Sequence, residues 1–391
     1  MALRGTNQES GRPYNRRIVL ETIRLHGPIA RGDIAKHVGL TVQTVSNIIR
    51  ELELERFVLG ARELPKGRGL PPTFLNINPD GGHAIGVHVT PAGLKAALIN
   101  LAGEIIGQRE KKLPHMRPAR AFREIGGLVT SLRKLRPRGR MLGIGLAMPG
   151  PFDVDSMSFV GPTTLVGWKG IPVRERLASL TGLPAFIEND MAAAALGERL
   201  YGAGRTLREF YYLYLGIGLG GCLVHEGAPL RGAFGNAGEI GHLPLVPNGE
   251  PCPCGNRGCL ERYLSLEAME RRSAAIGRDG WIAEAAPLLR AALVTIENLF
   301  DPETVVIGGP ADETVLTRLL DAAEPLAPSV SERRGRTSPR VTRAVAGANA
   351  TLLGAAALAV AGVLSPRLGS LFANDDEGAA LLRSRLATEA A

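Results

Sequence analysis

One histidine and three cysteines that lie close together in the sequence constrain this chain most. His242 is followed by Cys252, Cys254 and Cys259, all within 18 positions. Neutral imidazole and thiolates are the ligands of a closed tetrahedral zinc site, and the intervening prolines and glycines favour a tight loop. We therefore expect a structural Zn²⁺ in the loop 235–261, with no open position for catalysis. The alternative is three reduced cysteines beside a core histidine.

Composition indicates a globular cytoplasmic protein. Of the 391 residues, 45% are hydrophobic and 21% are charged, which is typical of soluble chains with two or three domains. The first residues lack the apolar segment of a signal peptide, and the apolar run 355–363 is too short to cross a bilayer. Few cysteines, mostly at metal-binding spacing, fit a reducing compartment, so we expect no membrane partner. Cys222, in an apolar run, is expected to be a buried hydrophobe.

The first 80 residues are predicted to form a helix-turn-helix. Apolar residues recur at helical spacing in 15–26, a short helix is expected over 31–38, and Gly39 suits a tight turn. Thr41 is placed to cap a third helix. The buried stripe of that helix is expected to consist of Val42, Val45, Ile49 and Leu52.

Charge and polarity point the same segment toward DNA. Residues 1–80 contain 12 Lys and Arg against 8 Asp and Glu, a net charge of +4. Strands at 57–59 and 73–77 would flank a glycine-bearing loop and form a wing. The alternatives are a small bundle for protein contacts and, for the loop, an ordinary solvated surface. The side chains expected to reach bases or phosphates are Gln43, Thr44, Asn47 and Arg50 of the third helix and Lys66 and Arg68 of the loop.

From residue 81 onward the pattern is α/β. Three strand-like runs at 83–89, 94–99 and 104–109 are followed by alternating helices and strands. A second strand–turn–strand unit surrounds the glycine-rich stretch 216–221. This repetition predicts two related lobes with a ligand cleft between them.

The motifs of this second part resemble those of the ROK family, which is named for repressors, open reading frames and kinases. The resemblance covers about residues 80–365, and its most specific part is the pairing of Gly-Glu-Ile-Gly-His242 with the cysteine loop. It implies an actin-like, ribonuclease-H-like ROK domain of two lobes over 81–391. The winged helix-turn-helix of 1–80 is a feature of the repressor branch. The matching motifs are Ile187-Glu-Asn-Asp190, Gly216-Ile-Gly-Leu-Gly-Gly221, Gly238-Glu-Ile-Gly-His242 and Cys252-Pro-Cys-Gly-Asn-Arg-Gly-Cys259.

The resemblance also implies a sugar site. Asp190 corresponds to the general base of the kinase members, and Thr164 lies where the family often has a sugar-contacting asparagine. Taken alone, Asn189 and Asp190 also fit a helix N-cap. The residues implied to bind sugar hydroxyls are Asn189, Asp190, Glu239, His242, Glu261 and Thr164.

One departure from the family pattern predicts that the chain is not an enzyme. Kinase members place an Asp-x-Gly-Gly-Thr loop against the phosphates of ATP, whereas this chain has His88-Val-Thr-Pro-Ala92. Proline lacks an N–H, and no carboxylate remains for magnesium. We therefore expect a sugar-responsive transcriptional regulator, acting on operator DNA as a homodimer or homotetramer, in which Asp190 has lost its catalytic role. The alternatives are an ATP-dependent sugar kinase with an accessory DNA-binding domain and a protein-interaction adaptor.

Overall fold

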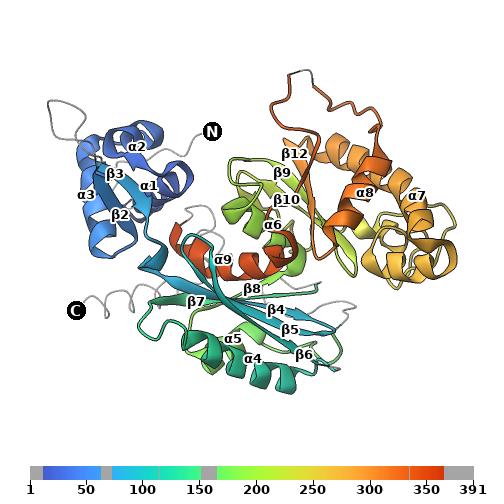
Figure 1. Cartoon of the computed structure of the whole chain (residues 1–391), viewed down its shortest axis with the longest axis horizontal. Coiled ribbons are helices and arrows are strands. Elements are labelled where there is room, and N and C mark those ends of the chain that lie inside the picture. The colour runs from blue at the N-terminus through green and yellow to red at the C-terminus, as the bar shows by residue number, and fades with distance from the viewer. Residues whose placement is uncertain (1–11, 63–72, 114, 151–164, 334, 365–391) are drawn as a thin grey trace.

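Three β-sheets organise the protein, one three-stranded and two five-stranded (Figure 1). The computed structural model describes residues 12–62, 73–113, 115–150, 165–333 and 335–364. Within that part of the chain, no helix is both long and apolar enough to cross a membrane.

The smallest sheet and the first three helices form a unit that we call the head. The Thr41 side chain accepts a hydrogen bond from the backbone N–H of Thr44, which confirms the predicted cap. The predicted buried stripe of α3 is wrong at one position. Val42 is 53% exposed, and Ile48, which was not part of the stripe, is buried beside Val45. The head comprises α1 (Arg12–His26), β1 (Ile29–Ala30), α2 (Arg31–Val38), α3 (Val42–Leu54), β2 (Val58–Arg62) and β3 (Thr73–Ile77), with strand order β1-β3-β2.

The second sheet and its helices form lobe I. Two antiparallel pairings extend its parallel part, so that the strand order is β6-β5-β4-β7-β8. Helices α4 and α5 cover one face of this sheet, and α9 covers the other (Figure 1). Its elements are η2 (Pro79–Gly81), β4 (His83–Thr90), β5 (Gly93–Asn100), β6 (Ile105–Lys112), α4 (Pro118–Arg133), β7 (Met141–Met148), α5 (Val173–Thr181), β8 (Ala185–Asn189), η5 (Gly347–Asn349) and α9 (Ala350–Leu364).

The third sheet and its helices form lobe II, in which α6 packs on β9 and β10. The strand order β11-β10-β9-β12-β13 repeats that of lobe I position for position, again with an antiparallel half and a parallel half. This repetition confirms the predicted pair of related α/β lobes. The elements are α6 (Asp190–Tyr201), β9 (Phe210–Leu215), β10 (Leu219–His225), β11 (Ala228–Pro229), η3 (Ile240–His242), η4 (Leu260–Arg262), α7 (Leu266–Phe300), β12 (Thr304–Gly308), α8 (Glu313–Ala323) and β13 (Val341–Arg343).

Helices α6 and α9 cross between the two lobes, where small residues bring their backbones together. A Cβ on Gly354 would lie 1.6 Å from the carbonyl oxygen of Ala193, and one on Gly197 would lie 2.5 Å from that of Ala350. Only glycine fits such close approaches. The crossing therefore joins lobe II, through α6, to lobe I, through α9.

Candidate functional site

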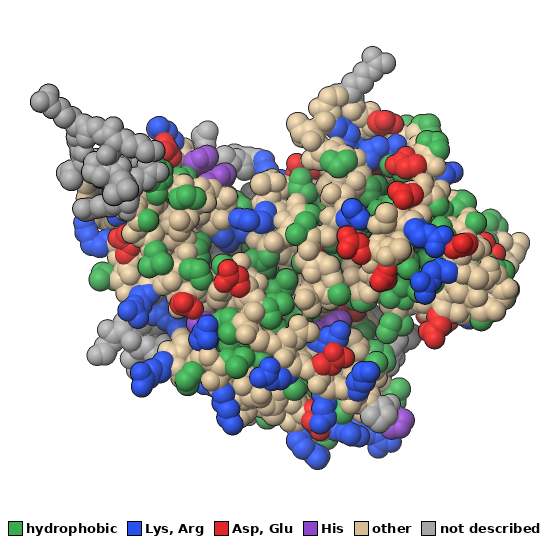
Figure 2. All heavy atoms as spheres, in the orientation of Figure 1, with side chains coloured by type: hydrophobic (Ala, Val, Ile, Leu, Met, Phe, Trp, Pro, Cys, Tyr) green, Lys and Arg blue, Asp and Glu red, His purple; other side chains and the backbone are tan. Residues whose placement is uncertain are grey.

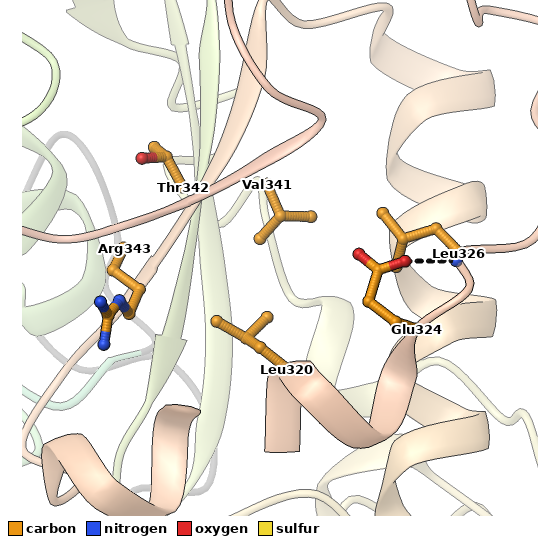
Figure 3. Close-up of a pocket in the computed structure, with 6 residues that line it drawn as sticks. All are labelled: Leu320, Glu324, Leu326, Val341, Thr342 and Arg343. Carbon is orange, nitrogen blue, oxygen red and sulfur yellow. Dashed lines mark hydrogen bonds between the residues drawn. The ribbon is translucent and has the colours of Figure 1, made fainter. Parts of the chain in front are cut away.

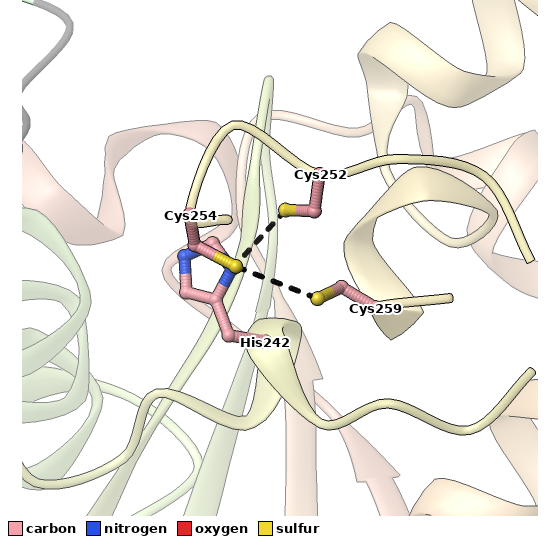
Figure 4. Close-up of side chains that lie close together, drawn as sticks. All are labelled: His242, Cys252, Cys254 and Cys259. Carbon is pink, nitrogen blue, oxygen red and sulfur yellow. Dashed lines mark hydrogen bonds between the residues drawn. The ribbon is translucent and has the colours of Figure 1, made fainter. Parts of the chain in front are cut away.

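The four sulfur and nitrogen ligands predicted from the sequence converge in space (Figure 4). All four candidate ligand atoms lie within 4.8 Å of one another. Cys252 Sγ is 3.6 Å from His242 Nδ1, and Cys254 Sγ is 3.6 Å from Cys259 Sγ. Zinc–sulfur bonds of about 2.3 Å place two sulfurs of a tetrahedral site about 3.8 Å apart. The group can therefore bind a metal ion, and its donor set and spacing suit Zn²⁺.

Short local contacts fold the cysteine loop. The N–H of Gly255 donates to the carbonyl of Cys252, and φ is +96° at Gly255 and +72° at Gly258, where glycine is the favoured residue. Glu250 fastens the loop to α7 through ion pairs with Arg271 and Arg272. The loop geometry is thus defined by neighbouring protein groups.

The protonation of the cysteines depends on their surroundings. The N–H of Asn256 lowers the pKa of Cys254 to about 7, so that its thiolate forms near neutral pH. Burial raises the pKa of Cys252 and Cys259. The charge of a divalent cation would lower both again, as is usual for thiols that ligate metals.

A strand end and a helix start present the first carboxylate of the site. Asn189 caps α6, since its side chain accepts a hydrogen bond of 2.7 Å from the N–H of Ala192. Asp190 follows as the first residue of the helix. Its Oδ1 atom is buried and has no hydrogen-bond partner among the described residues. Burial, together with the charge of Glu239, raises the pKa of Asp190 to about 6, although the N–H groups of Asp190 and Met191 lower it.

Two further carboxylates flank the segment that runs from His242 to Cys259. Gly238, with φ of +98° and no room for a Cβ beside the carbonyl of Gly221, holds the segment before Glu239 against β10. Glu261 accepts a 3.0 Å hydrogen bond from the N–H of Leu219. Burial and then the charge of Glu261 raise the pKa of Glu239, whereas His242 lowers it. The charge of Glu239 acts on Asp190 and that of Glu261 acts on Glu239, so we treat the three side chains as one acidic group.

His242 connects this acidic group to the cysteine cluster. Its Nδ1 atom faces Cys252, while its Nε2 atom is 4.0 Å from Glu239 Oε2. A metal ion on Nδ1 would leave Nε2 as an N–H donor directed toward the carboxylates. The arrangement offers adjacent acceptors and one fixed donor, which is the pattern that vicinal hydroxyl groups require.

Several predicted residues lie apart from this group. Thr164, Lys66 and Arg68 fall outside the described residues. Cys222 is buried at 2% exposure, as predicted, and does not join the metal cluster. A separate pocket of about 280 Å³ lies between the end of α8 and β13 (Figure 3), and none of the site residues named above lines it.

The outer face of α3 presents the polar side chains expected from the sequence. Gln43, Asn47 and Arg50 are exposed, and Thr44 is half-buried against Thr41. Exposed Val42, which the stripe had placed in the core, adds an apolar group to the same end of the helix. Val42 lies in the first turn of α3, before the helix packs against the core, and this position could have predicted that its side chain is exposed.

The hairpin between β4 and β5 contains the departure from the kinase pattern. Thr90 pairs with Gly93, so that Pro91 and Ala92 form the tip of a two-residue turn. His88 lies in β4, and burial together with the charge of Lys95 lowers its pKa to about 4, which leaves the imidazole neutral at physiological pH. The two turn residues carry no charge, and the nearest cation on the neighbouring strand is Lys112, which pairs with Gly93.

A buried ionic contact joins the head to α6. Arg24 makes two hydrogen bonds to Glu21, and both side chains are at most 6% exposed. Arg24 Nη1 also donates, at 2.7 Å, to the backbone carbonyl of Leu200 in the last turn of α6. Arg199 lies 3.7 Å from Glu21. Two opposite charges at i and i+3 on the apolar face of a helix are the only local signal for this contact.

Fold and site together define a class: two-lobed, actin-like α/β proteins with a histidine–cysteine loop beside a group of carboxylates, here preceded by a head of three helices and a small sheet. The ROK family model matches residues 84–361. The chain belongs to the ROK family, which confirms the resemblance inferred from the motifs.

Relatives within the family include regulators and kinases. The chain is similar to the xylose repressor of Caldicellulosiruptor bescii, with 30% identity over 341 residues, 76% of this chain and 83% of that protein. It is also similar to the glucokinase of Halalkalibacterium halodurans, with 31% identity over 264 residues, 58% of this chain and 79% of that protein. Among solved structures, a ROK family transcriptional regulator described as a homologue of the E. coli MLC protein matches its fold with a TM-score of 0.74 at 22% identity, covering 93% of this chain and 99% of that one.

Proposed function

We propose that this protein is a sugar-responsive transcriptional regulator, acting in the cytoplasm as a repressor of carbohydrate uptake or catabolism genes. Residues 1–80 would bind operator DNA, and residues 81–391 would bind the effector. The observation that carries the proposal is the position of α6, whose first turn borders the acidic group and whose last turn bonds to the head. The similarity to a protein named xylose repressor supports a sugar as the effector.

The head has the features needed to read DNA. Helix α3 would enter the major groove, where Gln43, Thr44, Asn47 and Arg50 meet base edges and phosphates. Val42 would contact a thymine methyl group. Lys66 and Arg68 would reach the backbone or the minor groove from the wing. Two heads are needed for two half-sites, so we propose a homodimer or homotetramer.

The acidic group is proposed as the sugar site. Asn189, Asp190, Glu239 and Glu261 would accept hydrogen bonds from hydroxyl groups, with Thr164 as a further contact, and His242 would donate one from Nε2. The four ligands His242, Cys252, Cys254 and Cys259 would hold a structural Zn²⁺, which supplies no chemistry here beyond fixing the loop.

The β4–β5 hairpin supports the absence of phosphoryl transfer. Such transfer depends on positioning and neutralising phosphate charge. At the tip of this hairpin Pro91 offers no N–H, and His88 is neutral. The glycine-rich stretch 216–221 resembles a second phosphate loop of the kinase members, which have a hydroxyl residue where this chain exposes the apolar side chain of Ile217. Asp190 would then bind sugar without a reaction to catalyse.

Helix α6 is proposed to transmit the effector signal. It spans about 18 Å from Asp190 to its last turn. The last carbonyl groups of a helix lack intrahelical partners, and the cation of Arg24 satisfies that of Leu200 while complementing the helix dipole. The head core also packs on Leu353 and Ala356 of α9. The head thus contacts both helices of the interlobe crossing, and closure of the lobes on a sugar would change its position.

Removing the buried ion pair should uncouple the two sites. The double variant Glu21→Gln/Arg24→Met avoids leaving one charge buried alone, which would be strongly destabilising. We expect this variant to bind both sugar and DNA, while the sugar-induced change in DNA affinity falls from about tenfold or more to nearly none. Fluorescence anisotropy with and without the effector measures that ratio.

A matched control is available in the next helix. Asp33 and Lys36 form an exposed pair at the same i and i+3 spacing. The variant Asp33→Asn/Lys36→Met should keep the wild-type ratio. A wild-type ratio in Glu21→Gln/Arg24→Met would instead show that α6 does not carry the signal through this contact.

The proposed function is tested by three measurements on the full chain. A duplex recovered by selection from random DNA should bind, with affinity falling steeply as salt rises. A panel of sugars and phosphosugars should contain one that stabilises the protein by about 2.7 kcal/mol at a hundredfold excess over its Kd, and that same sugar should release the duplex. ADP production from ATP with the hexose panel should stay at background. Turnover above background would favour the kinase alternative.

A further inference from the structure

The strongest concentration of positive charge in this chain lies outside the head. Residues 105–140 contain 11 Lys and Arg against 2 Asp and Glu, a net charge of +9, while the whole chain carries +8. They form β6, α4 and the connector to β7. The connector, residues 133–140, follows α4 directly and adds its exposed cations to those of the helix.

This basic face lies on the outside of lobe I. Figure 2 shows Lys and Arg side chains gathered over α4 and β6, with fewer acidic side chains between them. Nine of the 11 cations are exposed. Lys111 is 3.6 Å from Glu124. The exposed members of the basic face are Lys111, Lys112, Arg117, Arg120, Arg123, Arg133, Lys134, Arg136 and Arg138.

The basic face is continuous with the head. Arg140, at its edge, donates a 3.1 Å hydrogen bond to the carbonyl of Glu55 and lies 5.1 Å from the ring centre of Phe57. These contacts fasten the end of α3 and the start of β2 to lobe I. Arg140 therefore links the edge of the basic face directly to the head.

The chemistry of the face favours a phosphate backbone as its partner. Guanidinium groups predominate, and these match phosphate oxygens in a bidentate manner. Among the described residues between 105 and 140, no large apolar side chain is exposed. Protein interfaces normally have an apolar or aromatic centre, and membrane-binding surfaces insert apolar side chains. This face offers neither.

We propose that the basic face of lobe I binds the phosphate backbone of DNA that flanks the operator half-site held by the head. This inference rests on the proposed DNA-binding function and adds a second, sequence-independent contact surface to it. Such a surface lengthens the footprint and steepens the salt dependence, because each phosphate contact releases counterions. Specificity remains with α3.

The test compares two duplexes that share one selected operator, with and without about 15 base pairs of unrelated flanking sequence on each side. Anisotropy with the wild-type chain should show about tenfold or more tighter binding to the longer duplex. The variant Arg120→Glu/Arg123→Glu/Lys134→Glu should lose this gain, and its salt slope should fall by about 3. Its affinity for the short duplex should stay within about twofold, since it keeps the head.

A charge-matched control separates this effect from net charge. Arg278→Glu/Arg318→Glu/Arg333→Glu changes three exposed cations of lobe II and should keep the preference for the longer duplex. If the basic-face variant loses the same affinity for both duplexes, or if the wild type does not prefer the longer duplex, the flanking contact is overturned and the proposed function still stands. Failure of the wild type to bind either duplex would overturn both. Binding to vesicles of phosphatidylcholine with phosphatidylserine, and to poly-glutamate, is measured for the same variants. If the basic-face variant loses only vesicle binding, the face belongs to a membrane contact, and if it loses only poly-glutamate binding, it belongs to an acidic protein partner. Either result would overturn the proposal.

Discussion

Replacing Asp190 with asparagine is expected to stabilise the ligand-free protein and to abolish its response to sugar. Burial raises the pKa of this carboxyl from 3.8 to about 6, and Oδ1 has no hydrogen-bond partner among the described residues. At pH 7.5 the group is ionised, and the desolvated charge destabilises the fold by about 3 kcal/mol. Asparagine removes that charge at nearly the same volume. The Tm should rise by about 6–12 °C.

The pH dependence has a defined sign. A carboxyl with a raised folded-state pKa binds its proton more tightly in the folded chain, so its destabilising effect is complete above pH 6 and disappears as pH falls toward 4. The Tm difference between Asp190→Asn and the wild type should therefore shrink over that interval. Sugar affinity of the wild type should fall below pH 6, because the protonated carboxyl loses acceptor capacity.

Calorimetry at pH 7.5 and pH 4.5, with and without the effector, measures both effects. Asp321→Asn, an exposed aspartate on α8, serves as the control and should match the wild type throughout. An unchanged Tm and an intact sugar response in Asp190→Asn would mean that the residues carried over from the family resemblance do not form the effector site.

Replacing Cys259 with alanine is expected to remove the metal and the sugar site together. The purified wild type should contain about one zinc per chain, and the variant almost none, since three ligands bind zinc far more weakly than four. Cys259 is fully buried and lies two residues before Glu261, whose carboxylate is held at β10. We expect a loss of about 3 kcal/mol and a Tm lower by about 6–12 °C.

Cys222→Ala is the control for thiol removal. It deletes a buried thiol that is not part of the metal cluster, so the zinc content and the sugar response should persist. Elemental analysis of gel-filtered protein, before and after chelation, gives the metal content. A folded wild type without metal would refute the zinc assignment.

Whether a feature of the fold or the site could be predicted from the sequence depends on how far apart along the chain its interacting residues lie. The cap at Thr41, the bounds of α2 and the convergence of His242 with the three cysteines depend on neighbours within a few turns of chain, and spacing predicted them correctly. Val42 was misplaced because helical periodicity predicts a buried face but not where the helix leaves the core. The contact of Arg24 with Leu200 joins residues 176 positions apart, and no local pattern encodes such a pairing.

The same reasoning applies to the basic face. Its charges were visible in the sequence as two separate groups, around 109–123 and 133–140. Only the packing of α4 along β6 brings them onto one surface. The roles of Asn189, Glu239 and Glu261 remain predictions, although the structure brings their chain segments together with Asp190 and His242.

The glycine-lined crossing of α6 and α9 has a mechanical consequence. Helices that meet through bare backbone have few interlocking side chains, so a small rotation between them requires little change of rotamer and uncovers little apolar area. Lobe I and lobe II, joined in this way, can rotate relative to each other at a small cost in free energy. Descendants of this chain could therefore exchange the residues of the cleft for a new effector while the pivot, and the motion it permits, stays the same.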